Sequence, residues 1–413
     1  MRRAAPSAPP HAVLIASLTL LLALGPLTID LYLPALPSMQ GDLGASEAAI
    51  QLTITGATVG FGLGQLFVGP LSDSIGRRIP LLLAAVVHVA ASIGVGLSHD
   101  LSIVGGLRFA QGVGCTAASV VAVAIVRDVY TGYRFVRANA DLGAVAGLTP
   151  IAATLAGSAL LLAVDWRWLS FIVAAYGLLT AIVVAAVIPE TLDRARRHPI
   201  SWRSLAARYA LLARDRRYTA ATLVGMMGWS IQFANLSASP FLLQRTFGLG
   251  LGGYGVVFAA LTLLTLVTGQ ATSRLLIPRW GPTRLVPAFT AVGLLAGAAV
   301  IVDGVLWPAA VLGLLIPLPL LLMASTGAST CAGVVGISGH RDQAGTAASL
   351  AGSLNFLTAG LVTALIGLLG TGSAIGLGVV AVVAVAIAAI AGLALRRQGD
   401  PAELVLTGSI PLP

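Results

Sequence analysis

The 413-residue sequence contains no lysine, because all 24 of its basic residues are arginine, and only 15 residues are acidic. A phosphate-binding P-loop of the form GxxxxGK[ST] needs its lysine to reach the nucleotide phosphates. The sequence therefore excludes this nucleotide site, and we do not expect ATP to be the direct energy source.

Cysteine is also scarce, with Cys115 and Cys331 as the two copies. Both fall inside predicted membrane spans in different halves of the chain, which argues against a disulfide framework or a metal cluster. The sequence has no His, Cys or acidic cluster with catalytic or metal-ligand spacing. We therefore expect neither an enzyme nor a bound metal or cofactor.

Charge is low and apolar runs are long. Charged residues make up 9% of the chain and hydrophobic residues 57%, and the mean hydropathy is +0.95. A bilayer span needs about 20 apolar residues, whereas a membrane β-barrel shows short alternating segments. The sequence thus predicts an all-α membrane protein with twelve transmembrane helices. The predicted spans are 12–36, 47–69, 79–98, 101–126, 138–162, 168–189, 219–243, 253–276, 284–303, 306–330, 345–369 and 373–395.

The arginines are distributed unevenly among the loops. With the N-terminus inside, 21 of them lie in cytoplasmic segments, whereas only Arg167 and Arg245 lie outside and Arg108 lies within a span. The positive-inside rule then places both termini in the cytoplasm of a multi-pass plasma-membrane protein. The net charge of +9 reflects topology and contact with anionic lipid rather than nucleic-acid binding. The apolar run after the N-terminal arginines has full spanning length, so we expect no signal cleavage.

One long polar segment divides the chain. Residues 190–217, rich in arginine, form a predicted cytoplasmic linker between an N-terminal six-helix half, 1–189, and a C-terminal half, 218–413, with a short cytoplasmic tail. An internal repeat supports this division. A shift of 205 residues superposes Gly64 and Gln65 on Gly269 and Gln270, Gly76 on Gly281, Asp30 on Asn235 and Asp73 on Pro278.

The stretch 60–78, GFGLGQLFVGPLSDSIGRR, runs from an apolar segment into a charged turn. It resembles the loop between helices 2 and 3 that is typical of the major facilitator superfamily. The resemblance implies a conformational latch, which would consist of Gly69, Asp73, Gly76, Arg77 and Arg78 in this loop with Arg127 and Asp128 at the end of helix 4. The alternative is a pair of topogenic arginines beside a turn glycine.

Asp30 lies inside the first apolar span, in the stretch Thr28–Pro37. An ionisable group at the bilayer centre costs at least about 2.5 kcal/mol and is by default a functional candidate. A buried carboxyl group that takes up and releases protons would suit coupling to a proton gradient. The alternative is a hydrated acid near the outer interface.

Helix 4 places Arg108, Gln111, Gly112 and Cys115 on one face, at spacings of three, four and seven residues. This segment resembles a second signature of the superfamily, in which the helix 4 arginine serves proton transfer. Since Asp30 and Arg108 lie at similar predicted depths, we expect them to form the proton-coupling pair. The alternative is a structural arginine bonded to backbone carbonyls.

Further segments resemble the bicyclomycin and chloramphenicol resistance (Bcr/CflA) subgroup of drug:proton antiporters. They are the helix 1 stretch, Arg127-Asp128, NLSASPF at 235–241 and GTAASLAGSLNF at 345–356. Helix 5 departs from the antiporter pattern, because Gly-Pro-x-x-Gly-Gly is replaced by Ala153–Ser158 with Pro150 one turn earlier. The polar residues predicted to line a substrate cavity are Tyr32, Gln111, Gln232, Asn235 and Asn355.

The resemblance implies two six-helix halves and alternating access. It implies a proton-coupled multidrug efflux transporter that exports small amphiphilic antibiotics, such as chloramphenicol- or bicyclomycin-like compounds, without cofactor or obligate protein partner. The alternative is proton-coupled transport of one specific small metabolite, which the altered helix 5 favours. A membrane receptor or integral-membrane enzyme lacks support in the sequence.

Overall fold

The computed structural model describes residues 10–197, 199–308, 311–340 and 343–398. In these ranges the regular elements are helices, with no strand. Three of the 21 arginines assigned to cytoplasmic segments lie outside the described residues: Arg2, Arg3 and Arg341. The tail after Gln398 also lies outside them. The chain divides into two compact units, one formed by Met1–Ala45 with Gly56–Ser201 and the other by Ser46–Thr55 with Trp202–Pro413.

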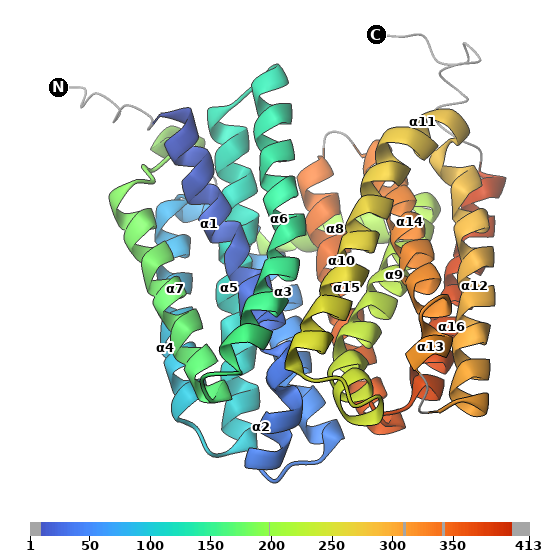
Figure 1. Cartoon of the computed structure of the whole chain (residues 1–413). Coiled ribbons are helices and arrows are strands. Elements are labelled where there is room, and N and C mark those ends of the chain that lie inside the picture. Colours follow the sequence, from blue (N-terminus) through green and yellow to red (C-terminus); the bar gives the residue numbers. More distant parts are fainter. Residues whose placement is uncertain (1–9, 198, 309–310, 341–342, 399–413) are drawn as a thin grey trace. The chain divides into compact units, whose positions relative to one another are not determined.

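Long helices connected by short turns build the first unit (Figure 1). They are α1 (His11–Asp30), α3 (Glu47–Ile75), α4 (Arg78–Leu97), α5 (Leu101–Val129), α6 (Gly132–Leu160) and α7 (Trp166–Ala186), with the short elements η1 (Leu33–Ala35), α2 (Leu36–Asp42) and η2 (Arg194–Arg196). The segment Ser46–Thr55, which includes the start of α3, groups with the second unit.

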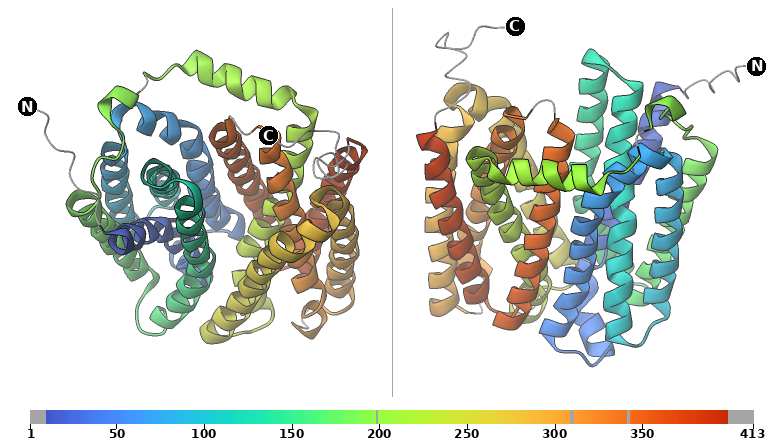
Figure 2. Two further views of the ribbon diagram at one scale, coloured as in Figure 1. Left: turned by 90° about the horizontal axis from the view of Figure 1, so that it is seen from above. Right: turned by 180° about the vertical axis from the view of Figure 1, so that it is seen from behind.

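The second unit repeats this pattern of long helices. They are α9 (Arg216–Phe241), α10 (Leu251–Ala271), α12 (Pro282–Leu306), α14 (Pro317–Ser338), α15 (Ala344–Leu369) and α16 (Ala374–Arg397), with the short elements η3 (Leu242–Thr246), η4 (Thr272–Leu276), α11 (Ile277–Trp280) and α13 (Val311–Leu314). An additional helix, α8 (Trp202–Arg214), precedes them and lies across the long helices of this unit rather than along them (Figure 2).

The predicted all-α membrane fold with twelve long helices is confirmed. Eleven helical segments among the described residues are long and apolar enough to cross a bilayer. The remaining predicted span, 219–243, forms α9 at its expected position. Buried polar residues such as Ser230, Asn235 and Ser237 make α9 less apolar than its neighbours.

Proline shapes two of the predicted spans. The span 12–36 lies within one candidate membrane span, His11–Asp42, but it is interrupted, because α1 ends at Asp30 and the chain continues through η1, which contains Pro34. The span 306–330 begins later, since α14 starts with Pro317 at its first position. Proline favours the first helical turn, where its missing N–H is not needed, and breaks the ladder elsewhere.

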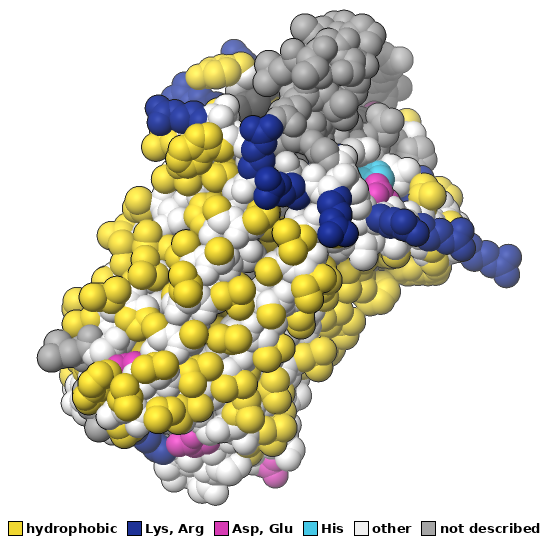
Figure 3. Space-filling view, turned by 90° about the vertical axis from the view of Figure 1, so that its right-hand side faces the viewer, with side chains coloured by type: hydrophobic (Ala, Val, Ile, Leu, Met, Phe, Trp, Pro, Cys, Tyr) yellow, Lys and Arg dark blue, Asp and Glu magenta, His cyan; other side chains and the backbone are white. Residues whose placement is uncertain are grey.

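Apolar side chains form both the core and the outer face of the second unit. Residues such as Val224, Leu321 and Leu377 are buried in one cluster. Apolar residues such as Leu295 on α12 and Ile390 on α16 are exposed. In the view of Figure 3, apolar side chains cover the body of the face shown, and arginines gather near one end. An apolar outer face suits contact with lipid chains rather than water.

Two glycines in the first unit bring α3 and α5 into backbone contact. A Cβ atom on Gly60 would lie 2.2 Å from the Phe109 carbonyl oxygen, and one on Gly112 would lie 2.0 Å from the Ala57 carbonyl oxygen. Only glycine permits so close an approach of two helices in a membrane. This packing holds α5, which carries Arg108, directly against α3.

Candidate functional site

The break at the end of α1 releases two backbone carbonyls into the first unit. The Tyr32 N–H bonds to the carbonyl of Ile29 rather than to that of Thr28, and Pro34 has no N–H to offer Asp30. The Thr28 carbonyl instead accepts a hydrogen bond from Arg108 Nη1 at 2.8 Å, and the Asp30 carbonyl accepts one from Thr154 Oγ1 at 3.4 Å. The end of α1 thus leaves two carbonyl acceptors at membrane depth, and Pro34 accounts for the one of Asp30.

Arg108 on α5 is 2% exposed and is held by neutral groups. Besides the Thr28 carbonyl, its Nη1 reaches Gln111 Oε1 at 3.3 Å. Its guanidinium carbon lies 3.9 Å from the ring centroid of Tyr32, which is a cation–π contact. Its Nε has no hydrogen-bond partner among the described residues. The positive charge is therefore stabilised by a carbonyl, an amide and an aromatic face.

Asp30 ends α1 and is buried, and within the described ranges its carboxylate takes part in no ion pair. The predicted bond between Asp30 and Arg108 is thus not formed in this structure. The bond to a backbone carbonyl, which was the alternative for Arg108, is formed. The role of Asp30 and Arg108 in proton coupling stays a prediction.

A polar network extends from Arg108 to α4. Gln111 Nε2 donates to Ser92 Oγ at 2.8 Å, and Ser92 Oγ donates to the carbonyl of His88 at 2.7 Å. His88 Nε2 in turn lies 2.9 Å from Thr28 Oγ1 on α1. Tyr32, at the other face of Arg108, bonds through its hydroxyl to Ser170 on α7. Gln111 and Tyr32, predicted to line a cavity, are fully buried and bonded within the protein.

The loop between α3 and α4 is built around a reversal at Gly76. Its φ of +100° lies in the left-handed region that favours glycine. The following residue, Arg77, turns inward and is 2% exposed. Its Nη1 contacts Asp73 Oδ1 at 2.5 Å and Ser72 Oγ at 2.8 Å, and its Nε donates to Asp128 Oδ2 at 2.8 Å.

Two carboxylates decide the charge state of Arg77. Burial disfavours its charged form, but the bonds to Asp128 and Asp73 outweigh this effect and raise the pKa of Arg77. The Asp128 side chain is only 5% exposed, whereas that of Asp73 is 52% exposed. The buried pair with Asp128 is therefore the core of the cluster, and Asp73 lies at its rim.

The other residues predicted for the latch contribute less. Gly69 leaves ordinary space, because an added Cβ would lie 3.9 Å from Val120. Arg78 donates through Nη2 to the carbonyl of Ala185. Arg127 is exposed and belongs to no ion pair of the described residues. The structure thus brings together Asp73, Gly76, Arg77 and Asp128.

The predicted cavity residues of the second unit lie on α9 and α15. Gln232 Nε2 donates to Thr326 Oγ1 at 2.7 Å and also reaches Ser325 and the carbonyl of Leu322. The amide oxygens of Asn235 and Asn355 are buried without a hydrogen-bond partner among the described residues. Trp229, Phe233 and Phe356 form an aromatic cluster on the same two helices, with centroid distances of 5.1 to 6.0 Å.

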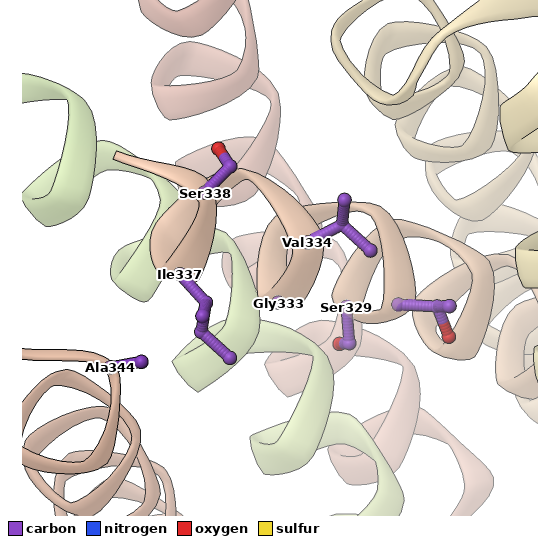
Figure 4. Close-up of a pocket in the computed structure, with 7 residues that line it drawn as sticks. Ser329, Gly333, Val334, Ile337, Ser338 and Ala344 are labelled. Atoms are coloured by element: carbon purple, nitrogen blue, oxygen red, sulfur yellow. The ribbon is translucent and has the colours of Figure 1, made fainter. Parts of the chain in front are cut away.

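An open groove of about 610 Å³ runs along α14 in the second unit (Figure 4). Its lining consists of Ser329, Thr330, Gly333, Val334, Ile337 and Ser338 with Ala344 of α15. This lining contains none of the predicted cavity residues. The hydroxyl groups of serine and threonine are its polar atoms, and its surface is otherwise apolar.

The family model that matches the chain is described as Major Facilitator Superfamily and covers residues 18–363. The chain belongs to the major facilitator superfamily. It is therefore a multi-pass membrane protein of a transporter family. A solved structure of another superfamily member, a bacterial homologue of the human lysosomal transporter Spinster in an inward-facing and unoccupied conformation, matches 94% of this chain and 98% of its own with a TM-score of 0.72. Its identity of 16% supports the fold alone.

Two superfamily relatives have names that refer to drugs. The chloramphenicol resistance protein of Pseudomonas aeruginosa is 32% identical over 74% of this chain and 71% of its own length. The bicyclomycin resistance protein homolog of Haemophilus influenzae is 24% identical over 86% of this chain and 88% of its own length. The resemblance inferred from the sequence motifs is thereby confirmed.

The sequence analysis missed an acid that follows α7 and caps the loop between α3 and α4. Glu190, after α7, accepts the backbone N–H groups of Arg77 at 2.9 Å, Arg78 at 3.4 Å and Leu192 at 3.1 Å. A Cβ on Gly76 would lie 2.3 Å from its carboxylate, so the glycine makes room for this cap. The available signal was an acid directly after the last apolar residues of the sixth span, in Pro189-Glu190-Thr191. His88 and Thr28 were missed as well.

Proposed function

We propose that this chain is a proton-coupled drug efflux transporter that exchanges protons for small amphiphilic antibiotics by alternating access. The names of the chloramphenicol and bicyclomycin resistance relatives support the substrate class. The observation that carries the coupling is Asp30, a buried acid at a helix break within a membrane-spanning segment. Ionisable groups at membrane depth are expensive and mark proton or substrate pathways.

Asp30 is suited to exchange a proton because its carboxylate is not already committed to an ion pair. Arg108 lies in the same polar region and is stabilised by neutral partners. A drug that enters near these groups changes the balance between a protonated Asp30 and a charged one. In our proposal, protonation and drug binding therefore compete, which is what antiport requires.

The loop around Arg77 acts in this proposal as the conformational latch, and the termini lie in the cytoplasm of a cell that carries the protein in its plasma membrane. The contacts of Arg77 with Asp73 and Asp128 support the first point. The excess of arginine in the predicted cytoplasmic segments supports the second.

The test of substrate class is drug susceptibility of an efflux-deficient host that expresses the chain, across antibiotics including chloramphenicol and bicyclomycin. We expect lower susceptibility to at least one of them, and we expect a protonophore to abolish efflux while ATP is maintained. Efflux that persists after the proton gradient is dissipated would disprove antiport.

The test of the coupling residue is drug-induced proton release from purified protein in detergent. We expect Asp30→Asn to lose this release while it still binds drug, because an amide cannot release a proton. Asp303→Asn is the matched control, since Asp303 is also a buried acid without a hydrogen-bond partner among the described residues. Undiminished release from Asp30→Asn would assign the proton to another acid.

A second candidate function is proton-coupled transport of one specific metabolite. The departure at helix 5 favours it, where Gly157 packs against the α1 break, with an added Cβ only 2.2 Å from the Leu31 carbonyl oxygen. Unchanged susceptibility to every antibiotic, together with proton uptake driven by one metabolite of a panel, would favour this alternative.

A further inference from the structure

His88 is a fully buried histidine in the middle of α4, and two glycines make room for it. A Cβ on Gly114 of α5 would lie 2.9 Å from the His88 Cβ, and one on Gly177 of α7 would lie 2.8 Å from its Nδ1. Because α4 packs between these helices, a larger residue at either position displaces the imidazole. Packing against Gly114 and Gly177 thus fixes the position of the imidazole ring.

The hydrogen bonds of Thr28 define which nitrogen of His88 carries the proton. The Thr28 hydroxyl donates its single hydrogen to the carbonyl of Leu24 at 2.6 Å. Its oxygen must then accept from the other neighbours, which are His88 Nε2 at 2.9 Å and Cys115 Sγ at 3.4 Å. His88 is therefore the neutral tautomer with the hydrogen on Nε2, and its Nδ1 has no partner among the described residues.

Two chains of hydrogen bonds lead from His88 to Arg108. The first passes through Thr28. Its hydroxyl oxygen accepts a hydrogen bond from His88 Nε2, and its carbonyl accepts one from Arg108 Nη1 at 2.8 Å. The second passes through Ser92, whose hydroxyl donates to the His88 backbone carbonyl and accepts from Gln111 Nε2. The amide oxygen of Gln111 then accepts a hydrogen bond from Arg108 Nη1. The imidazole of His88 thus acts on Arg108 through Thr28, whereas the second chain reaches the His88 backbone carbonyl, which a substitution at position 88 retains.

We propose that His88 is a positioning residue for proton coupling: it fixes Thr28 so that Arg108 stays on neutral partners and off the carboxylate of Asp30, which lies two residues further along α1. This inference rests on the proposed antiport function. The Asp30 carboxylate is kept free to exchange its proton because Arg108, its candidate counter-charge, is held by the Thr28 carbonyl, Gln111 and Tyr32. Among the titratable or charged groups near this network are Asp30 at the end of α1, Tyr32 just after it, Arg108 and Cys115 on α5, and Tyr176 on α7.

The tautomer is tested without any substrate. Protein labelled with ¹⁵N on its histidine rings is studied by NMR in detergent at neutral pH, and the signals lost in His88→Gln identify His88. We expect a protonated Nε2 and a bare Nδ1. A hydrogen on Nδ1, or a doubly protonated ring, would overturn the proposal.

The positioning role is tested with matched substitutions. His88→Leu and Thr28→Val each remove one side of the His88–Thr28 bond, whereas His88→Gln retains an N–H donor. Thr149→Val on α6 is the control, because among the described residues the Thr149 hydroxyl bonds only to its own helix, at the Val145 carbonyl. We expect His88→Leu and Thr28→Val each to lower drug–proton exchange about tenfold and to change its pH profile, and the double variant to be no worse than either single one. Additive effects, or a wild-type pH profile in His88→Leu, would contradict the proposal.

A third readout separates this inference from the proposed function. In a Cys331→Ser background, we expect alkylation of Cys115 to become faster in His88→Leu and Thr28→Val but not in His88→Gln, because the Cys115–Thr28 contact belongs to the same network. If the wild type moves no drug, the antiport proposal fails, while the NMR tautomer and Cys115 alkylation still decide the network. Equal alkylation in all variants would overturn the network.

Discussion

The loop at Gly76, after α3, and its counterpart at Gly281, after α11, have the same turn and different chemistry. In the first loop, Gly76 has a φ of +100°, and in the second, Gly281 has a φ of +73°. In both loops a new long helix starts after this glycine. The first loop carries Asp73 and buries Arg77 among carboxylates. The second turn and the helical residues beside it, 272–284, contain no acid.

This difference separates what the fold requires from what the first loop adds. A helix that leaves the membrane and reverses needs a residue with positive φ, and both loops supply glycine. In the second loop Pro282 then opens α12 at the position favoured for proline. A buried arginine with two carboxylates is not needed for the turn, so we attribute it to the latch.

The largest expected effect is that of Arg77→Met. It leaves the Asp128 carboxylate buried without its charged partner, which costs about 3–5 kcal/mol of the free energy of unfolding. The matched control in the second loop is Arg279→Met, where an exposed arginine is worth at most about 1 kcal/mol. Thermal unfolding in detergent measures both. Equal losses from the two variants would remove the distinction between the loops.

The glycine substitutions come next in size. Gly76→Ala and Gly281→Ala both force a side chain into positive φ, which costs about 1–3 kcal/mol of strain. Gly76→Ala also places a Cβ 2.3 Å from the Glu190 carboxylate, so we expect it to lose the Glu190 cap in addition. Thermal unfolding should thus show the larger loss for Gly76→Ala. If the two glycine variants lose equal stability in a Glu190→Ala background, the Glu190 cap is the cause of the difference.

The membrane fold could be predicted from the sequence because each of its causes is local. Runs of about 20 apolar residues define most spans, and the glycine, aspartate and arginines of 69–78 are recognisable without coordinates. The boundaries of α1 and α14 were missed because proline acts on the backbone ladder and not on hydropathy. The spacing of Arg108, Gln111 and Cys115 correctly placed them on one face of α5.

The partners of these residues could not be predicted in the same way. Arg108 was expected to pair with Asp30 or, in the alternative, to bond to backbone carbonyls. The broken end of α1 offers it the Thr28 carbonyl, and no sequence pattern indicates which carbonyl lacks its helical partner. Glu190 and His88 act through contacts more than 50 residues away in the chain, at Arg77 and Thr28. Tertiary packing decides such pairs, whereas sequence spacing reports only neighbours on one helix.

The smallest expected effect on stability, and the sharpest test of the latch, belongs to Asp73→Asn. Asp73 is half exposed, and Arg77 keeps Asp128 and Ser72 when it is lost, so we expect a change of less than about 1 kcal/mol. The topogenic arginines Arg77 and Arg78 remain, so insertion should be unchanged. Transport should nevertheless fall by up to about fivefold, because a contact that contributes up to about 1 kcal/mol to one conformation shifts the population by that factor. Cysteine accessibility and drug transport are measured together, with the neighbouring Ser74→Ala as control, since Ser74 bonds only to Leu71 of its own helix. Normal transport by correctly inserted Asp73→Asn would leave Asp73 without a role in the latch and would reduce the difference between the two loops to the pair of Arg77 and Asp128.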